Sequence, residues 1–429
     1  DGYQDYYGYQ ATYKTYNYSF GGAQAAALAQ NRIGNSRLEW ESTTVTNFGV
    51  DAGFLNNRLT AELDVYNKVT DGILTTPNLH LTMGIKTPPT MNTAEVTNRG
   101  FELTVGWKDH VGDFNYAVST NFSYNHNEVT KYLGKYEAGW VEKDGKKVWQ
   151  SNIGDVSVDK DKGRIVEGHP IKEYYTLNTY SGNGTHFNSD GSVNINGGPK
   201  DGMIRTEGDM KWLNAMIDAG YKFMPNQSVG RNNIYYGDLI YADLNGDGIY
   251  GSSYDYDFQG SSAMPKFGYG INISASWKNF DLSMLWAGNG GFKLYWEEDP
   301  YNSVAIRNGF ATSERVANDH YFYDPENPTD SRTNLNGYIP RLVENSKQSR
   351  QTSNYYLYNG TYMKLKNLTI GYTLPVTLTE KISAERVRVY LSGENLFTIT
   401  SFPGQDPEMG ATTNYPSLRQ FAAGISVTF

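Results

Sequence analysis

The last nine residues of the chain alternate between two kinds of side chain with a period of two. Phe421, Ala423, Ile425, Val427 and Phe429 form an apolar row, and small or polar residues, Ala422, Gly424, Ser426 and Thr428, lie between them. A strand shows this alternation when one of its faces meets lipid and the other meets water. The pattern predicts a membrane-spanning β-strand that ends on an aromatic residue.

The same alternation recurs along the chain in segments close to the ~9–11 residues that a tilted strand needs to cross a bilayer. The clearest case is a hairpin in which 267–277 and 280–286 flank a tight turn at Lys278-Asn279. A change of phase between Leu365 and Leu368 predicts a β-bulge in one arm. In all, about ten antiparallel spanning strands of an all-β transmembrane barrel are predicted, at 9–20, 40–54, 59–65, 101–107, 114–124, 267–277, 280–286, 363–374, 387–396 and 421–429.

Short and long connections alternate between these strands. Outer-membrane barrels have short periplasmic turns and long outer loops, so Phe429 is expected on the periplasmic side. Segments 171–181 and 234–243 also look extended, and we interpret them as parts of one large outer excursion rather than as spanning strands. The short turns are 56–57, 110–112, 278–279 and 375–385, and the long segments are 21–37, 76–93, 131–264, 297–359 and 401–416.

Composition excludes several other classes of protein. The chain contains no apolar run near the ~18 residues of a membrane helix. Its net charge of -9, without a basic cluster, argues against a nucleic-acid partner. The absence of Cys is compatible with export through an oxidising compartment. The first residues show no targeting peptide, so we expect a mature or truncated form of an exported protein.

One segment carries the first half of a calcium-loop pattern. Oxygen-bearing side chains alternate in Asp243-Leu244-Asn245-Gly246-Asp247-Gly248, but Tyr254 stands where the bidentate Glu of an EF-hand belongs. The alternative is a Gly/Asp turn whose side chains cap their own backbone. The predicted calcium ligands are Asp243, Asn245, Asp247, the carbonyl of Ile249, and Asp255.

No catalytic arrangement stands out, because the six His residues lack metal-ligand spacing and no nucleophile elbow is present. The chain is therefore not expected to be an enzyme. Aromatic residues instead gather on the predicted outer loops. Their flat apolar faces and polar tips suit sugar rings or peptide side chains, although loop packing is the alternative role for each of them. The predicted ligand-binding residues are Tyr174, Tyr175, Tyr235, Tyr236, Tyr295, Trp296, Tyr321 and Tyr323.

Several strings, in this order and spacing, give the chain a family resemblance. Much of it resembles the C-terminal part of the barrel of SusC/RagA-like TonB-dependent transporters of Bacteroidetes. The resemblance covers residues 37–429 in patches and is strongest in the second half. The strings that carry it are Leu38-Glu39-Trp40-Glu41, Phe54–Leu59, Asn98–Leu103, Tyr241–Gly248, Pro265–Gly270, Trp277–Leu282, Lys364–Tyr372 and Ser392–Phe397.

The resemblance implies a barrel of about 22 strands, plugged by an N-terminal domain, that imports large nutrients using TonB and the proton-motive force. A SusD-like surface lipoprotein would cover it as a lid. Residues 1–429 would then be the C-terminal part of the barrel, surrounded by lipid and lipopolysaccharide, and the plug and the other strands would lie on an N-terminal part.

Import of oligosaccharides is the leading hypothesis for the function, and import of oligopeptides is its main alternative. Two further classes remain open at this point. One is a ten-stranded outer-membrane protease or esterase that uses His126 as its base, and the other is a surface barrel without a transport function.

Overall fold

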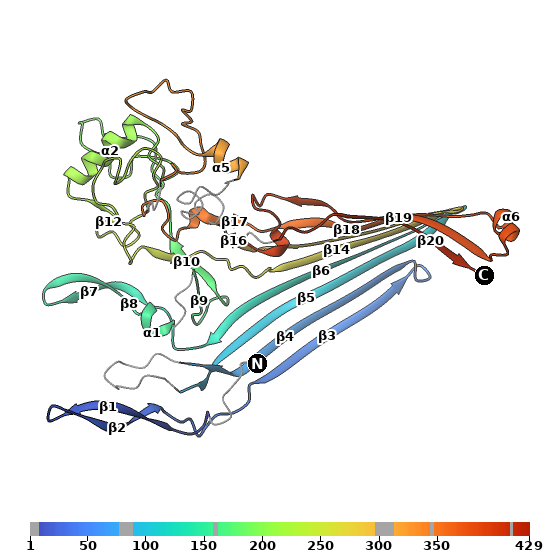
Figure 1. Ribbon diagram of the computed structural model, residues 1–429, viewed down its shortest axis with the longest axis horizontal. Helices are drawn as coiled ribbons and strands as arrows, with labels where there is room; N and C mark the ends of the chain where they lie inside the picture. The colour runs from blue at the N-terminus through green and yellow to red at the C-terminus, as the bar shows by residue number, and fades with distance from the viewer. Residues whose placement is uncertain (1–7, 77–88, 158–161, 297–312, 344–346, 412–414) are drawn as a thin grey trace.

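In the computed structural model, which describes residues 8–76, 89–157, 162–296, 313–343, 347–411 and 415–429, nine strands form one antiparallel sheet (Figure 1). Their order across the sheet is β20-β19-β18-β15-β14-β6-β5-β4-β3. The strands are β3 (Ser42–Phe54), β4 (Leu59–Thr75), β5 (Met91–Val111), β6 (Phe114–Lys131), β14 (Phe267–Trp277), β15 (Phe280–Gly290), β18 (Tyr362–Thr373), β19 (Arg386–Thr400) and β20 (Gln420–Thr428).

The register of this sheet sorts side chains into the two faces that the alternation predicts. Residues paired across neighbouring strands lie on the same face of a sheet. One row of paired residues is apolar: Ala423, Leu391, Ile370, Leu282 and Ala275. The next row is small or polar: Ala422, Ser392, Thr369, Ser283 and Ser274. The sheet therefore has one apolar face and one polar face, as a barrel wall requires.

The tight turns and the bulge are confirmed. Trp277 pairs with Phe280, so that Lys278-Asn279 forms the turn, and Lys278 adopts a φ of 51°. Val111 pairs with Phe114 across an equally short turn. The register of β18 shifts between Leu365 and Asn367, where the phase change predicts a bulge. The longer turn between β18 and β19 contains α6 (Val376–Thr379) and η3 (Glu380–Ile382).

The prediction for the N-terminal arm is wrong. Residues 9–20 were expected to span the membrane and to precede a long loop at 21–37. Instead, β1 (Thr12–Phe20) and β2 (Ala23–Arg32) form a separate two-stranded hairpin, and the large sheet of the described residues has nine strands rather than about ten. The physical reason is the turn, because Gly21 and Gly22 both take a positive φ, which glycine adopts without steric cost.

Most of the remaining described residues form a lobe, which we define as residues 162–264, 313–343 and 347–356. The helix α6 lies at one end of the large sheet, and the lobe lies beyond the other end (Figure 1). Its elements are β9 (Gly163–Arg164), β10 (Glu173–Leu177), α2 (Glu207–Asp218), β11 (Lys222–Phe223), β12 (Ile249–Tyr250), β13 (Tyr256–Phe258), α5 (Glu314–Asp319) and η2 (Asn354–Tyr356). Beside it lie β7 (Ala138–Lys143), β8 (Lys146–Ser151), α1 (Ile153–Val156), β16 (Lys293–Tyr295), β17 (Leu357–Asn359) and η4 (Pro407–Met409).

The lobe holds the main hydrophobic core of the described residues. Trp212, Met203, Ile204 and Leu239 are completely buried there, together with Tyr321 from the distant segment 313–343. Segments 171–181 and 234–243 belong to the lobe and not to the large sheet, as predicted: β10 pairs with β9 and β13, and Tyr241 makes an isolated bridge to Thr179. No helix in the described ranges is long and apolar enough to cross a membrane.

Candidate ligand-binding site

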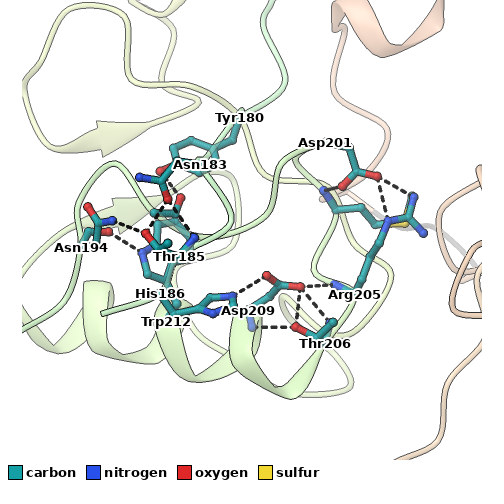
Figure 2. A network of polar contacts seen from close by, with 12 residues as sticks. Tyr180, Asn183, Thr185, His186, Asn194, Asp201, Arg205, Thr206, Asp209 and Trp212 are labelled. Atoms are coloured by element: carbon teal, nitrogen blue, oxygen red, sulfur yellow. Dashed lines mark hydrogen bonds and ion pairs between the residues drawn. The ribbon is translucent and has the colours of Figure 1, made fainter. Parts of the chain in front are cut away.

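Helix α2 is fixed in the lobe by polar contacts at its first turn (Figure 2). The Thr206 hydroxyl accepts a hydrogen bond from the Asp209 amide at 3.1 Å, and the Asp209 carboxylate accepts one from the Thr206 amide at 2.9 Å. This reciprocal pair is a capping box, which satisfies two amides that have no partner within the helix. The other oxygen of Asp209 lies 2.9 Å from His186 Nε2. The Trp212 indole donates to the carbonyl of Asn194 at 2.7 Å.

Arg205 joins two segments that are far apart in sequence. Its guanidinium donates to Asp201 at 2.8 Å and to the carbonyls of Leu335 and Gly337, both at 2.9 Å. The Tyr321 hydroxyl in turn donates to the carbonyl of Arg205 at 2.6 Å. Burial raises the pKa of Tyr321, which keeps its hydroxyl a neutral donor. These contacts hold segment 313–343 against the first half of the lobe.

A cavity of about 740 Å³ lies where these two segments meet, and it is the candidate site. Four of the eight aromatic residues predicted to bind a ligand line it: Tyr235, Tyr236, Tyr321 and Tyr323. Tyr321 and Tyr236 are buried, whereas Tyr235 and Tyr323 are half-buried. The rings of Tyr236 and Tyr323 pack edge to face with centroids 5.0 Å apart. A cavity of this size with aromatic walls is typical of a ligand site.

Three arginines also line the cavity, and each has a carboxylate partner. Arg231 lies 3.1 Å from Asp324, and Arg341 lies 2.7 Å from the fully buried Asp238.

Arg332 holds the third carboxylate, Asp330, through two contacts of 3.0 and 2.7 Å. The hydrogen bonds from Arg332 lower the pKa of Asp330 to about 2. The positive charges of the three arginines are therefore compensated by carboxylates. The sequence analysis missed the arginines because it selected aromatic residues alone.

The other four predicted aromatics lie elsewhere. Tyr174 and Tyr295 are buried in a second hydrophobic cluster and line a separate cavity of about 310 Å³. Tyr175 packs against Phe258 with ring centroids 4.8 Å apart, and Trp296 is buried in a third cluster. A ligand-binding role for these four stays a prediction, and their burial favours the packing role that was its alternative.

The predicted calcium ligands form one compact loop. Asp243 accepts hydrogen bonds from the amides of Gly246 and Gly248 at 2.7 and 2.8 Å, and Asp247 accepts one from the Ile249 amide at 2.8 Å. Asp255 accepts from the amides of Leu244 and Ser252 at 2.8 and 2.7 Å. Asn245 accepts from the Asp247 amide at 3.1 Å.

These oxygens thus cap the backbone of their own loop, which is the alternative interpretation of the pattern. Among the described residues, no three His, Asp or Glu side chains converge to hold a metal. Calcium binding at this loop stays a prediction.

His126, the base of the protease alternative, lies on β6. Its Nε2 is 3.6 Å from Glu128, which is too long for a hydrogen bond, and both side chains are partly exposed. This pair lacks the tight geometry that activates a catalytic base.

Comparison with known proteins identifies relatives at the level of sequence. The family described as "TonB dependent receptor-like, beta-barrel" matches residues 1–223. The "TonB-dependent receptor P3" of Formosa agariphila is 26% identical over 95% of this chain and 36% of its own length. The "TonB-dependent receptor SusC" of Bacteroides thetaiotaomicron is 25% identical over 92% of this chain and 32% of its own length. The chain thus spans about a third of the length of these relatives.

Solved structures show the same fold at lower identity. The RagAB peptide transporter superimposes with a TM-score of 0.66 at 21% identity, covering 99% of this chain and 38% of the solved chain. The RagAB peptide importer in its closed-closed state gives a TM-score of 0.64 at 22% identity, with 39% of that chain covered. The nine-stranded sheet and its lobe therefore follow an arrangement already seen in part of a larger chain.

Proposed function

The chain belongs to the TonB-dependent receptor-like β-barrel family, and from this premise we propose that it forms wall and mouth of an outer-membrane importer of oligosaccharides. The wall is the nine-stranded sheet, whose apolar face meets lipid and whose polar face lines the lumen. The mouth is the lobe, which meets the nutrient. The C-terminal residue Phe429 lies on the periplasmic side, and the lobe lies outside the cell.

The observation that carries the choice of cargo is the cavity of about 740 Å³ in the lobe. Its aromatic walls offer flat apolar faces, and its arginines offer hydrogen-bond donors whose charges are already compensated. This combination suits a ligand rich in neutral hydroxyl groups more than it suits a charged one.

Import of oligopeptides is the second candidate. The solved structures that share the fold of this chain include RagAB, which is described as a peptide importer. The chain is expected to work with its N-terminal remainder and plug, with TonB, and with a SusD-like surface lipoprotein as a lid. The energy for transport would come through the plug and TonB.

Deletion of the gene tests this proposal. The deletion strain is expected to lose growth on one class of oligosaccharide and to keep growth on free monosaccharides. The full-length protein, purified from membranes, is expected to bring a surface lipoprotein with it. Loss of growth only on oligopeptides would favour the second candidate. Unchanged growth on every oligomer, with no copurifying lipoprotein, would leave a surface barrel without transport.

A further inference from the structure

We propose that the cavity of the lobe is a saccharide subsite in its own right, which binds one or two neutral sugar rings outside the lumen. This inference deepens the proposed import of oligosaccharides and rests on it. It assigns binding to specific residues: the half-buried Tyr323 as the ring platform, and Arg332 and His320 as partners of hydroxyl groups.

The cavity offers both donors and an acceptor. The ion pair of Arg332 with Asp330 uses Nε and one Nη, so the N–H groups of the other Nη are not engaged by it. His320 Nδ1 lies 2.8 Å from the carbonyl of Val316, which can only accept. The proton of the neutral ring is therefore on Nδ1, and Nε2 is left as an acceptor. A sugar hydroxyl is both donor and acceptor, so it matches this mixture.

The aromatic rings of the cavity are held in place before a ligand arrives. Tyr235 lies against two guanidinium groups, with Arg341 at 5.4 Å and Arg231 at 5.8 Å from the ring centroid. Arg332 lies 4.7 Å from the centroid of Phe322. Such cation–π contacts fix both partners. Tyr323 packs edge to face with Tyr236 and lines the cavity while half-buried, so we assign its ring as the platform for the apolar side of a sugar.

Charge compensation points to a neutral saccharide. Three guanidinium groups of the cavity each have a carboxylate within 3.1 Å, and Glu326 lies a further 3.6 Å from Arg231. A sulfated or uronate-rich chain would have to compete with these carboxylates and would be repelled by them. A neutral ring instead uses the spare N–H groups without disturbing the ion pairs.

Calorimetry on the full-length protein in detergent tests the subsite. The neutral probes are maltohexaose, cellohexaose, mannohexaose and xylohexaose, and hexagalacturonate is the anionic probe. The variants are Tyr323→Leu and Arg332→Gln, the latter chosen because the Arg332 side chain is 71% exposed and contributes little to folding. Their matched controls in the same lobe are Tyr254→Leu and Lys211→Gln, at residues that are exposed and do not line the cavity.

At least one neutral hexasaccharide is expected to bind the wild type. Each cavity variant is expected to weaken that binding about tenfold or more, which is the loss of one good contact, and each control less than about twofold. If wild type binds a neutral hexasaccharide and both cavity variants bind it equally well, the subsite is refuted while oligosaccharide import stands. Tighter binding of hexagalacturonate than of every neutral probe refutes the neutral class. No binding of any neutral probe to wild type also refutes the subsite, and growth of the deletion strain then decides separately on import.

Discussion

Lys364, at the start of β18, is buried in a network of opposite charges that ties a loop to the sheet. It is 1% exposed, and its ammonium lies 2.6 Å from Asp406 and 2.7 Å from Glu408. Both carboxylates belong to the connection between β19 and β20. We predict that Lys364→Met releases the segment 401–411 of this connection, because it leaves a buried carboxylate without its cation.

The free-energy cost of Lys364→Met depends on the contacts that Asp406 and Glu408 retain. Removal of one partner of a buried ion pair costs about 3–5 kcal/mol. Asp406 retains the hydroxyl of Ser417, and Glu408 retains Lys366 at 2.7 Å. The cost is therefore expected at the lower end, about 3 kcal/mol, or about 150-fold in a local opening equilibrium. Lys366 is 31% exposed, so Lys366→Met should cost no more than about 1 kcal/mol, or about fivefold.

Hydrogen exchange followed by mass spectrometry measures this effect on the full-length protein in detergent. Amides of 401–411 should exchange about 150-fold faster in Lys364→Met, while Lys366→Met serves as the matched control. The double variant Lys364→Met with Asp406→Leu should recover much of the protection, because an apolar pair replaces the ionic one. Equal exchange in the two single variants, or no recovery in the double variant, would refute the reasoning.

Three further predictions concern stability and ions. Burial alone would raise the pKa values of Asp406 and Glu408, but the hydrogen bonds and charge of Lys364, together with Ser417 at Asp406 and Lys366 at Glu408, lower both below their ordinary values. The network is thus fully stabilising above about pH 5 and is lost as the pH falls below about 4. Smaller protection factors of 401–411 in acid, calculated against the intrinsic exchange rate at each pH, would reveal this loss. Trp212→Ala should lower the free energy of unfolding of the lobe by about 3–5 kcal/mol, so that trypsin cleaves the lobe. The heat-modifiable mobility of the barrel on gels should stay unchanged. A lobe that trypsin does not cleave would contradict this prediction. The predicted calcium loop should give calcium-dependent heat that Asp247→Ala abolishes, and wild type without such heat would remove the prediction.

The large sheet could be predicted from the sequence because its signal is local. A strand that separates lipid from water must alternate residue by residue, so 267–277 and 280–286 reveal their faces, their turn and their pairing without any distant contact. The bulge near Lys366 could also be predicted from the sequence, because an extra residue reverses the phase of the alternation.

The hairpin β1–β2 escaped prediction because β2 is rich in alanine, which has low strand propensity and no clear alternation.

The lobe and its cavity depend on contacts that no local pattern encodes. Tyr236 and Tyr323 meet across two segments that Arg205 and Tyr321 join through contacts more than a hundred residues apart in sequence. Four of the eight aromatic residues that composition selected line the cavity, and their role in ligand binding stays a prediction. Composition did not predict which aromatics would be buried. One local signal was present and unused: Thr206 with Asp209 three residues later, followed by Gly220, is typical of a capped helix, and α2 lies there.

Strand β5 is 21 residues long, and its neighbour β6 has 18. A tilted strand crosses the hydrocarbon layer in about 9–11 residues, so roughly ten residues of β5 stand clear of it, a length of ~30 Å. Because β5 and β6 stay paired along this rise, from Glu95 with Lys131 to Val111 with Phe114, it is stiffer than a single extended chain would be. Shortening β5 and β6 together by two residues each would remove about 7 Å of this paired extension, measured along the strands.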